Sequence, residues 1–244
     1  ETRAIYAALL TPQGKFLHDF FIVERGGKLL LDCDSARVGD LEKRLKMYRL
    51  RAKVDIADET ADWSVYALLP GGGEAGAAED WMGGVAFADP RHAGLGLRAI
   101  APANADPGES GLTPGELADY DAVRVALGIP DGARDLVPEK SMPLENGFDE
   151  LNGVSFAKGC FVGQEVTTRM KHRNLVKRRL FPVAIDGAAE AGMTVKSGEA
   201  DAGELRAVMD GHGLALLRLD MAERDDLVAG DAAIRPARPD WVKF

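Results

Sequence analysis

The sequence predicts an α+β fold that ends in a small β-barrel, and three observations lead to this prediction. Two apolar, aromatic-rich runs at residues 3–10 and 15–23 flank a Thr-Pro-Gln-Gly turn, which is typical of a β-hairpin. Residues 36–51 carry apolar side chains at helical spacing. Beyond residue 175, short strand-like runs alternate with glycine-bearing turns, as they do in small barrels and sandwiches.

The first third of the chain is expected to alternate strands with one helix. Gly26 and Gly27 mark a turn after the hairpin, and residues 28–31 are expected to form a third strand. Ser35 is the expected N-cap of the 36–51 helix, whose apolar face would pack on the sheet. Further strands are expected at residues 54–56, 63–69, 85–88 and 95–100.

A second helix is expected in the middle of the chain. Thr113-Pro114-Gly115-Glu116 forms a capping box with proline at the first helical position, and the helix should end before Gly128. Residues 130–154 contain three prolines and no long periodic run, which predicts an extended surface loop of a length that is often functional. We expect two domains, residues 1–174 and residues 175–244, the second being the barrel.

Composition and charge exclude several classes of protein. The formal net charge of −9 excludes a general nucleic-acid coat, and no apolar run approaches the roughly 18 residues of a membrane helix. Two cysteines cannot build a disulfide framework or a four-thiolate cluster site, and the four histidines lack ligand spacing. We therefore expect no metal site and a reducing compartment. The chain begins at Glu1 without Met, directly on a strand-like run, so we expect it to be part of a longer chain.

The most informative segment is Phe-Ala-Lys-Gly-Cys-Phe-Val-Gly-Gln-Glu at residues 156–165. Gln164 opens a stretch with helical propensity, so Cys160 is expected just ahead of a helix. Lys158 and the amide dipoles of that helix would both favour the thiolate of Cys160, which is typical of a reactive cysteine. The alternative is that Cys160 is a small buried side chain.

Residues 143–169, which contain this segment, resemble the signature of the YgfZ family. These are folate-binding proteins that support iron–sulfur enzymes, and they are relatives of the glycine-cleavage T protein, an aminomethyltransferase. The opening Leu-Leu-Thr-Pro-Gln-Gly-Lys-Phe-Leu-His-Asp-Phe and the runs that end at Val54 and Pro130 agree with the resemblance. It implies two α+β halves and a C-terminal barrel arranged as a ring around tetrahydrofolate or a derivative. It also implies a strand and a helix ahead of Glu1.

The resemblance implies roles for individual residues. Glu145 would accept hydrogen bonds from the amide and amino edge of the pterin, although a solvated loop acid is the alternative. Asp19 lies where the T protein has an aspartate near the reactive folate nitrogens, with His18 in place of a second acid. Arg124 would meet the folate tail, unless it is an ordinary surface arginine.

A run of cations stands out in this acidic chain and comprises Arg169, Lys171, His172, Arg173, Lys177, Arg178 and Arg179. The run is most simply a solvated face. It could also attract the carboxylates of a folate tail, an acidic partner protein or an RNA, the last being weaker because no aromatic residues are interleaved. We count Lys158, Gln164 and Arg169 with Glu145 and Arg124 as folate-binding candidates, and Cys160 with Asp19 as catalytic candidates.

The leading hypothesis is a folate-binding accessory protein that supports the assembly or repair of iron–sulfur enzymes, including those of tRNA modification. Its expected partners are folate and iron–sulfur client enzymes or assembly factors, and we expect neither a membrane nor direct RNA binding. It would be cytoplasmic in a bacterium and in the mitochondrial matrix of a eukaryote. The alternatives are a folate-dependent aminomethyltransferase and an adaptor that works through the basic run.

Overall fold

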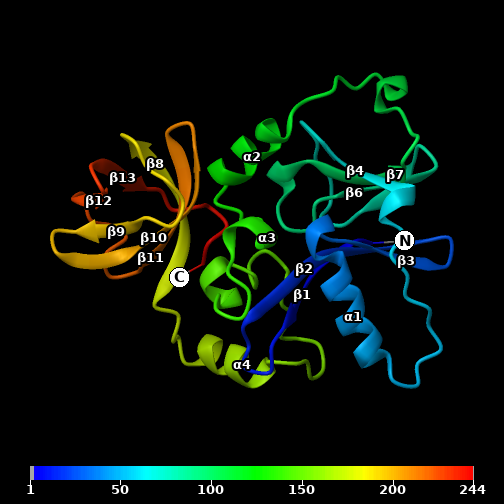
Figure 1. Ribbon diagram of the computed structural model, residues 1–244, viewed down its shortest axis with the longest axis horizontal. Coiled ribbons are helices and arrows are strands. Elements are labelled where there is room, and N and C mark those ends of the chain that lie inside the picture. Colours follow the sequence, from blue (N-terminus) through cyan, green and yellow to red (C-terminus); the bar gives the residue numbers. More distant parts are fainter. Residues whose placement is uncertain (1–2, 244) are drawn as a thin grey trace. The chain divides into compact units, whose positions relative to one another are not determined.

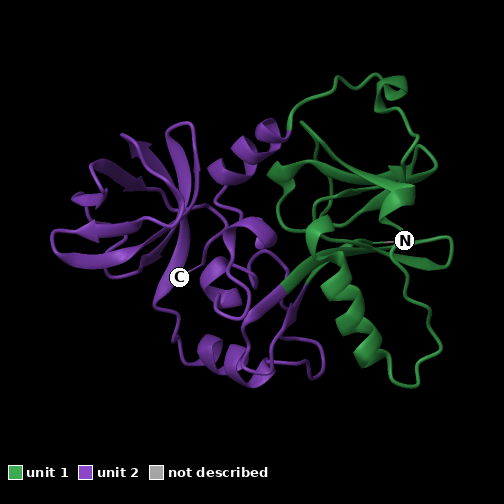
Figure 2. Ribbon diagram, viewed as in Figure 1, with its two compact units in different colours: residues 1–7, 18–116 green, residues 8–17, 117–244 purple. Residues whose placement is uncertain are grey.

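The computed structural model describes residues 3–243, which form two compact units. Unit 1 comprises residues 1–7 and 18–116, and unit 2 comprises residues 8–17 and 117–244 (Figure 2). The chain therefore enters unit 2 early, through the tip of the N-terminal hairpin, before it returns to build unit 1.

Unit 1 contains two sheets and one α-helix (Figure 1). The first sheet has the order β1-β2-β3, with β1 (Ile5–Leu10), β2 (Phe16–Arg25) and β3 (Lys28–Asp32); the tip of its hairpin belongs to unit 2. The second has the order β4-β7-β6-β5, with β4 (Trp63–Leu68), β5 (Ala78–Trp81), β6 (Gly84–Ala88) and β7 (Leu97–Pro102). The helix is α1 (Val38–Arg49), and short 3₁₀ turns lie at Ser35–Arg37, Thr60–Asp62, Ala93–Leu95 and Pro107–Ser110.

The hairpin and the first helix agree with the sequence, with two corrections. The amide of Gly14 donates to the carbonyl of Thr11 at 2.8 Å, which closes the predicted turn. The cap ahead of α1 is Asp34 rather than Ser35, since the Asp34 carboxylate accepts from the amide of Ala36 at 2.9 Å. The expected strand at residues 54–56 is absent, because these described residues join no sheet.

Unit 2 consists of short helices followed by a closed barrel. The helices are α2 (Leu117–Ala126), α3 (Gly132–Asp135) and α4 (Gln164–His172), with a 3₁₀ turn, η5, at Pro143–Asn146. The barrel strands are β8 (Arg178–Asp186), β9 (Thr194–Ser197), β10 (Ala200–Met209), β11 (His212–Arg218), β12 (Leu227–Ala229) and β13 (Ala232–Pro236). They close in the order β10-β11-β8-β13-β12-β9, which confirms the barrel that the sequence predicts.

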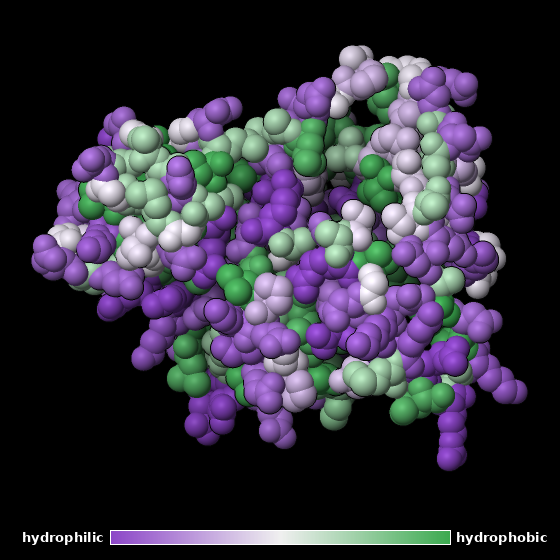
Figure 3. All heavy atoms as spheres, in the orientation of Figure 1, coloured by the Kyte–Doolittle hydropathy of each residue, from purple (hydrophilic) through white to green (hydrophobic). Residues whose placement is uncertain are grey.

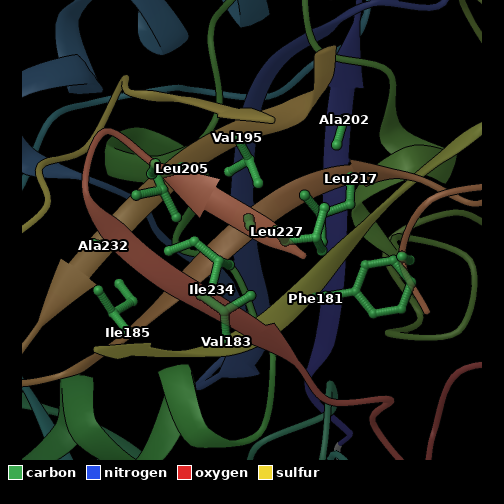
Figure 4. Packing of buried hydrophobic residues seen from close by; sticks show 13 residues of the cluster. Phe181, Val183, Ile185, Val195, Ala202, Leu205, Leu217, Leu227, Ala232 and Ile234 are labelled. Carbon is green, nitrogen blue, oxygen red and sulfur yellow. The ribbon is translucent and has the colours of Figure 1, made fainter. Parts of the chain in front are cut away.

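Apolar side chains at alternate positions of the strands fill the interior of the barrel. On β8, Phe181, Val183 and Ile185 occupy every second position and are all buried, as expected for one face of a strand. They join Leu205, Leu217 and other aliphatic side chains in a single cluster inside the barrel (Figure 4). The barrel is therefore a packed core.

Three local expectations for unit 2 differ from the structure. α2 begins at Leu117, so residues 113–116 lie ahead of the helix and the capping box does not form its first turn. The expected loop at 130–154 contains α3, a single turn capped by the Asp131 carboxylate, which accepts from the amide of Ala133 at 3.0 Å. Strands β9 and β12 were not expected, because four and three residues are too short to show a pattern.

The visible surface is mainly polar, with apolar residues scattered across it (Figure 3). Among residues 3–243, no helix has both the length and the apolar character needed to cross a bilayer.

Candidate functional site

The cysteine segment of unit 2 is anchored through glycines. Gly163 has φ of +83°, and a Cβ there would lie 2.6 Å from the carbonyl oxygen of Thr11 and 2.8 Å from Cα of Gly14. A Cβ on Gly14 would in turn lie 3.1 Å from the carbonyl oxygen of Gly163. These two glycines let the hairpin tip pack directly on the start of α4, because neither position has room for a side chain.

Cys160 is exposed on this anchored segment, four positions before the first residue of α4. The buried alternative for Cys160 is therefore wrong. The Gln164 side chain turns back and accepts a hydrogen bond from the amide of Phe161 at 3.2 Å, while the Lys158 ammonium lies 5.4 Å from the centre of the Phe161 ring. Lys158 and Gln164 thus both contact Phe161, and the segment presents a thiol to solvent on a defined backbone.

The other cysteine has a different environment. Cys33 follows β3 in unit 1 and is half-buried. Burial, and then the carboxylates of Asp32 and Asp34, raise the pKa of its thiol to about 11. Cys33 is protonated at neutral pH and is a poor nucleophile, whereas the catalytic role of Cys160 stays a prediction.

A cavity of about 380 Å³ lies in unit 2 between the loop that contains Glu145 and one side of the barrel. The loop contributes Lys140, Ser141 and Glu145, and the barrel strands contribute Arg178 from β8 with Glu204 and Arg206 from β10. The volume falls in the range of small-molecule sites. The lining mixes three cations with two carboxylates, which suits a ligand that carries both hydrogen-bond donors and negative charge.

Glu145 is the half-buried carboxylate of this cavity. Burial raises its pKa, and the nearby charges of Arg178, Lys15 and Arg206 oppose that shift. A carboxylate in such a setting has lost much of its water while cations remain close, so it gains from a ligand that donates N–H groups to both oxygens.

Arg124 is buried in an ion network at the end of α2. Its guanidinium donates to Asp121 and to Asp135 at 2.6 Å each, and its side chain is only 4% exposed. Arg134 adds two further bonds to Asp121 at 2.6 and 2.7 Å. The alternative of an ordinary surface arginine is wrong, and Arg124 holds α2 to α3. Its contact with a folate tail stays a prediction.

Asp19 belongs to unit 1, where the Tyr6 hydroxyl donates to its carboxylate at 2.8 Å. Burial and the neighbouring Asp19 raise the pKa of Tyr6 well above its ordinary value, so Tyr6 remains a donor. His18, its neighbour on β2, is buried, and its Nε2 lies 2.7 Å from Asp40 of α1. Asp19 and His18 therefore have separate partners, and the catalytic role of Asp19 stays a prediction.

The cationic run of residues 169–179 divides into two kinds of side chain. Arg169, Arg173, Lys177 and Arg178 are exposed, and so is His172. Arg179 is buried, where it donates to the carbonyl of Leu144 at 2.5 Å and to Glu150, so it is not part of a solvated face. Lys171 donates to Asp149 at 2.7 Å. The exposed members lie near Cys160 in the chain, on α4 and the segment after it.

Within unit 2 the structure thus places Glu145 and Arg178 in one cavity, and it places Lys158, Cys160 and Gln164 on one segment. Lys140 and Arg206 were missed as cavity residues, because a loop lysine and a barrel arginine carry no motif. Among residues 3–243, no group of three or more histidine, cysteine or acidic side chains is arranged to hold a metal ion.

The barrel and the chain as a whole both resemble known proteins. The C-terminal β-barrel domain of CAF17 matches residues 177–244. The chain is 36% identical to the mitochondrial iron-sulfur cluster assembly factor IBA57 of Mus musculus, over 98% of this chain and 73% of that protein. It is 39% identical to the Homo sapiens IBA57, over 88% of this chain and 65% of that protein.

A solved structure shows the same fold. The glycine cleavage system aminomethyltransferase T from Bartonella henselae superposes with a TM-score of 0.75 at 14% identity, covering 98% of this chain and 76% of that one. The predicted α+β aminomethyltransferase fold with a C-terminal barrel is confirmed. The motif resemblance pointed to the YgfZ family, whereas the relatives that match the chain are IBA57 proteins. With more than a third of its residues identical across nearly its whole length, the chain belongs to the IBA57 family.

Proposed function

We propose that this protein supports the assembly of iron–sulfur enzymes and that it binds a reduced folate in the cavity beside Glu145. The observation that carries the proposal is that unit 2 contains both that cavity and an exposed thiol, on the segment anchored by Gly163. The relatives are named iron-sulfur cluster assembly factors of mitochondria, which supports both the role and a mitochondrial location.

The cavity suits a folate on chemical grounds. A pterin presents an amide N–H and an amino group side by side, and the Glu145 carboxylate can accept both. The glutamate tail of a folate carries carboxylates, for which Arg178, Arg206 and Lys140 are suitable partners. Arg169, which is exposed on α4, is proposed to act farther along such a tail.

The exposed cations that follow Cys160 in the chain suit a protein partner. Arg169, Arg173 and Lys177 are exposed in a chain whose net charge is −9, and Val162 and Leu175 are exposed apolar residues in the same segment. Basic residues around apolar side chains are typical of a surface that meets an acidic protein. We propose that an iron–sulfur client or assembly factor meets Cys160 there.

Calorimetric titration with tetrahydrofolate under anaerobic conditions tests the folate part. Wild type should bind, and Glu145→Gln should weaken binding by about tenfold or more, because it removes a charge-assisted pair of hydrogen bonds. The matched control is Glu139→Gln, an exposed glutamate on the same loop, which should bind as wild type does. Equal binding by the wild type and Glu145→Gln would remove the cavity from consideration.

Complementation tests the assembly part. In cells that lack their own relative, wild type should restore the activity of mitochondrial iron–sulfur enzymes and Cys160→Ser should not. Cys33→Ser is the control for loss of a thiol and should restore activity. Full restoration by Cys160→Ser would refute a role for the thiol.

The alternative is a folate-dependent aminomethyltransferase that uses Asp19. The carboxylate of Asp19 is held by Tyr6, so an acid at that position is fixed rather than free to rotate. Formation of methylenetetrahydrofolate from an aminomethyl-lipoyl carrier protein would support this alternative, and it should be lost in Asp19→Asn.

A further inference from the structure

Two neighbouring carboxyl groups lie buried beside the loop that presents Glu145. The side chains of Asp149 and Glu150 are 12% and 8% exposed, and each has one cationic partner. Lys171 of α4 donates to Oδ2 of Asp149 at 2.7 Å, and Arg179 of β8 donates to Oε1 of Glu150. The pair therefore connects three separate parts of unit 2.

The other oxygen of each carboxyl group has no donor. Oδ1 of Asp149 and Oε2 of Glu150 are both buried, and neither accepts a hydrogen bond from any N–H or hydroxyl group in the described part of the chain. A buried carboxylate oxygen without a donor is costly, and two such oxygens on adjacent residues would repel each other. One proton between them removes both problems, since it turns one oxygen into a donor for the other.

The titration behaviour agrees with this arrangement. Burial raises the pKa of Glu150, and the neighbouring carboxyl group of Asp149 raises it further. Burial disfavours the charged form of Asp149 too, but the hydrogen bond from Glu150 and the charge of Lys171 outweigh it and lower the pKa of Asp149. The charged groups that act on the pair are Lys171 from α4 and Arg179 from β8, besides the two carboxyl groups themselves.

Arg179 links the carboxyl pair to the backbone next to Glu145. The same guanidinium that holds Glu150 donates to the carbonyl of Leu144 at 2.5 Å, one residue before Glu145. Arg178, its neighbour on β8, lines the cavity that contains Glu145. Adjacent residues of a strand point to opposite sides, so the start of β8 holds the backbone of η5 with one arginine and faces the carboxylate with the other.

We infer that Asp149 and Glu150 hold a single proton between Oδ1 and Oε2, and that this carboxyl pair is a positioning device for Glu145. The pair acts through Arg179 and the Leu144 carbonyl and touches no ligand itself. Its link to folate rests on the function proposed above, whereas the shared proton does not. When the pH rises through the pKa of Glu150, both carboxyl groups ionise, repel each other and loosen the hold on η5.

The first test detects the proton without any ligand. In protein labelled with ¹³C at the glutamate carboxyl, the signals of Glu145 and Glu150 should titrate at higher pH than the others, and one of these two should be missing in Glu150→Gln. Infrared difference spectra should show the carbonyl band of a protonated carboxylic acid in wild type, lost in the same variant. A Glu150 signal that titrates with the bulk of the glutamates would overturn the inference.

The second test measures positioning. Amide hydrogen exchange of residues 143–154 should speed up in wild type as pH rises through the Glu150 transition, beyond the intrinsic change that unstructured peptides show. Glu150→Gln keeps a donor toward Asp149 and an acceptor for Arg179, so its exchange should lack this extra step. The charge-matched control Glu223→Gln, at an exposed position, should behave as wild type. The same extra step in wild type and Glu150→Gln would overturn the positioning role.

The third test uses tetrahydrofolate. Affinity of wild type should fall by up to about tenfold per pH unit above the Glu150 transition, and Glu150→Gln should bind with an affinity that does not change across it. If the proton is detected but folate binds neither protein, the proposed function fails and the shared proton stands. If folate binds with the same pH profile in wild type and Glu150→Gln, the positioning role fails and folate binding stands.

Discussion

The buried ion network at the end of α2 gives a quantitative prediction for Arg124→Met. The substitution keeps most of the aliphatic volume and removes the guanidinium that donates to Asp121 and Asp135 at 2.6 Å each. Asp121 keeps Arg134, but Asp135, with a side chain only 3% exposed, keeps only the amide of Asp131 at 2.8 Å. Removing one partner of a buried ion pair typically costs about 3–5 kcal/mol, and we expect a loss in this range.

The matched control is Arg134→Met, because Arg134 is 38% exposed and its loss leaves Asp121 paired with Arg124. Exposed partners are screened by water, so this variant should lose about 1 kcal/mol or less. Urea unfolding of unit 2 can be followed by the fluorescence of Trp241, whose indole donates to the carbonyl of Leu127, after Trp63 and Trp81 of unit 1 are replaced by Phe.

The double variant Arg124→Met/Asp135→Asn supplies a second check. This variant removes the unpaired charge of Asp135, so it should recover part of the stability that Arg124→Met loses. Burial raises the pKa of Asp135 in the folded protein, and loss of Arg124 should raise it further. A carboxyl group whose pKa is higher in the folded than in the unfolded protein lowers the free energy of unfolding as pH rises. The stability lost in Arg124→Met should therefore be largest at neutral pH and smaller in acid. Equal losses for Arg124→Met and Arg134→Met would refute the reasoning.

Three further outcomes follow from the geometry. Gly163→Ala should lose at least about 2 kcal/mol of unfolding free energy in urea, because a left-handed alanine is strained and its Cβ would meet backbone atoms. The control Gly159→Ala should keep its stability, because a Cβ there would have nothing within 4 Å. Burial lowers the pKa of His18, so stability should fall as pH drops below about 6.5, and His18→Phe should flatten that decline in pH-dependent thermal melts. Tyr6→Phe should cost about 1 kcal/mol in the same melts, since Asp19 loses a hydroxyl donor; an unchanged melting temperature would contradict this.

Local chemistry explains why much of the fold was predictable. The hairpin, β3, α1, the strands β4, β6 and β7 and the barrel are specified by turns, spacing and alternation that lie within a few residues of each other. Strands β9 and β12 and helix α3 are too short for any period to appear. The expected strand at 54–56 failed because two β-branched residues, Val54 and Ile56, do not by themselves find a partner strand.

The candidate site was predictable only where a motif carried it. The cysteine motif predicted a helix beginning at Gln164, whereas it left open whether Cys160 is reactive or buried. The cavity instead depends on Lys140, Arg178 and Arg206. These residues come from distant parts of the chain and lie together only once the barrel has formed. The burial of Arg179 was unpredictable for the same reason, since its partners lie at positions 144 and 150.

The split hairpin has a consequence for biosynthesis and for protein engineering. Residues 8–17 leave the ribosome long before residues 117–244, yet their unit is completed only when residues 117–244 have been made. Phe16 is fully buried in the folded protein, where its ring centre lies 5.8 Å from that of Phe148. It can be covered in this way only after Phe148 has been synthesised. Until then the nascent chain exposes a large aromatic residue, so we expect chaperones to bind this stretch during synthesis. A truncation that begins at residue 117 would lack this aromatic residue, so an isolated second unit should be produced with the hairpin tip supplied or grafted.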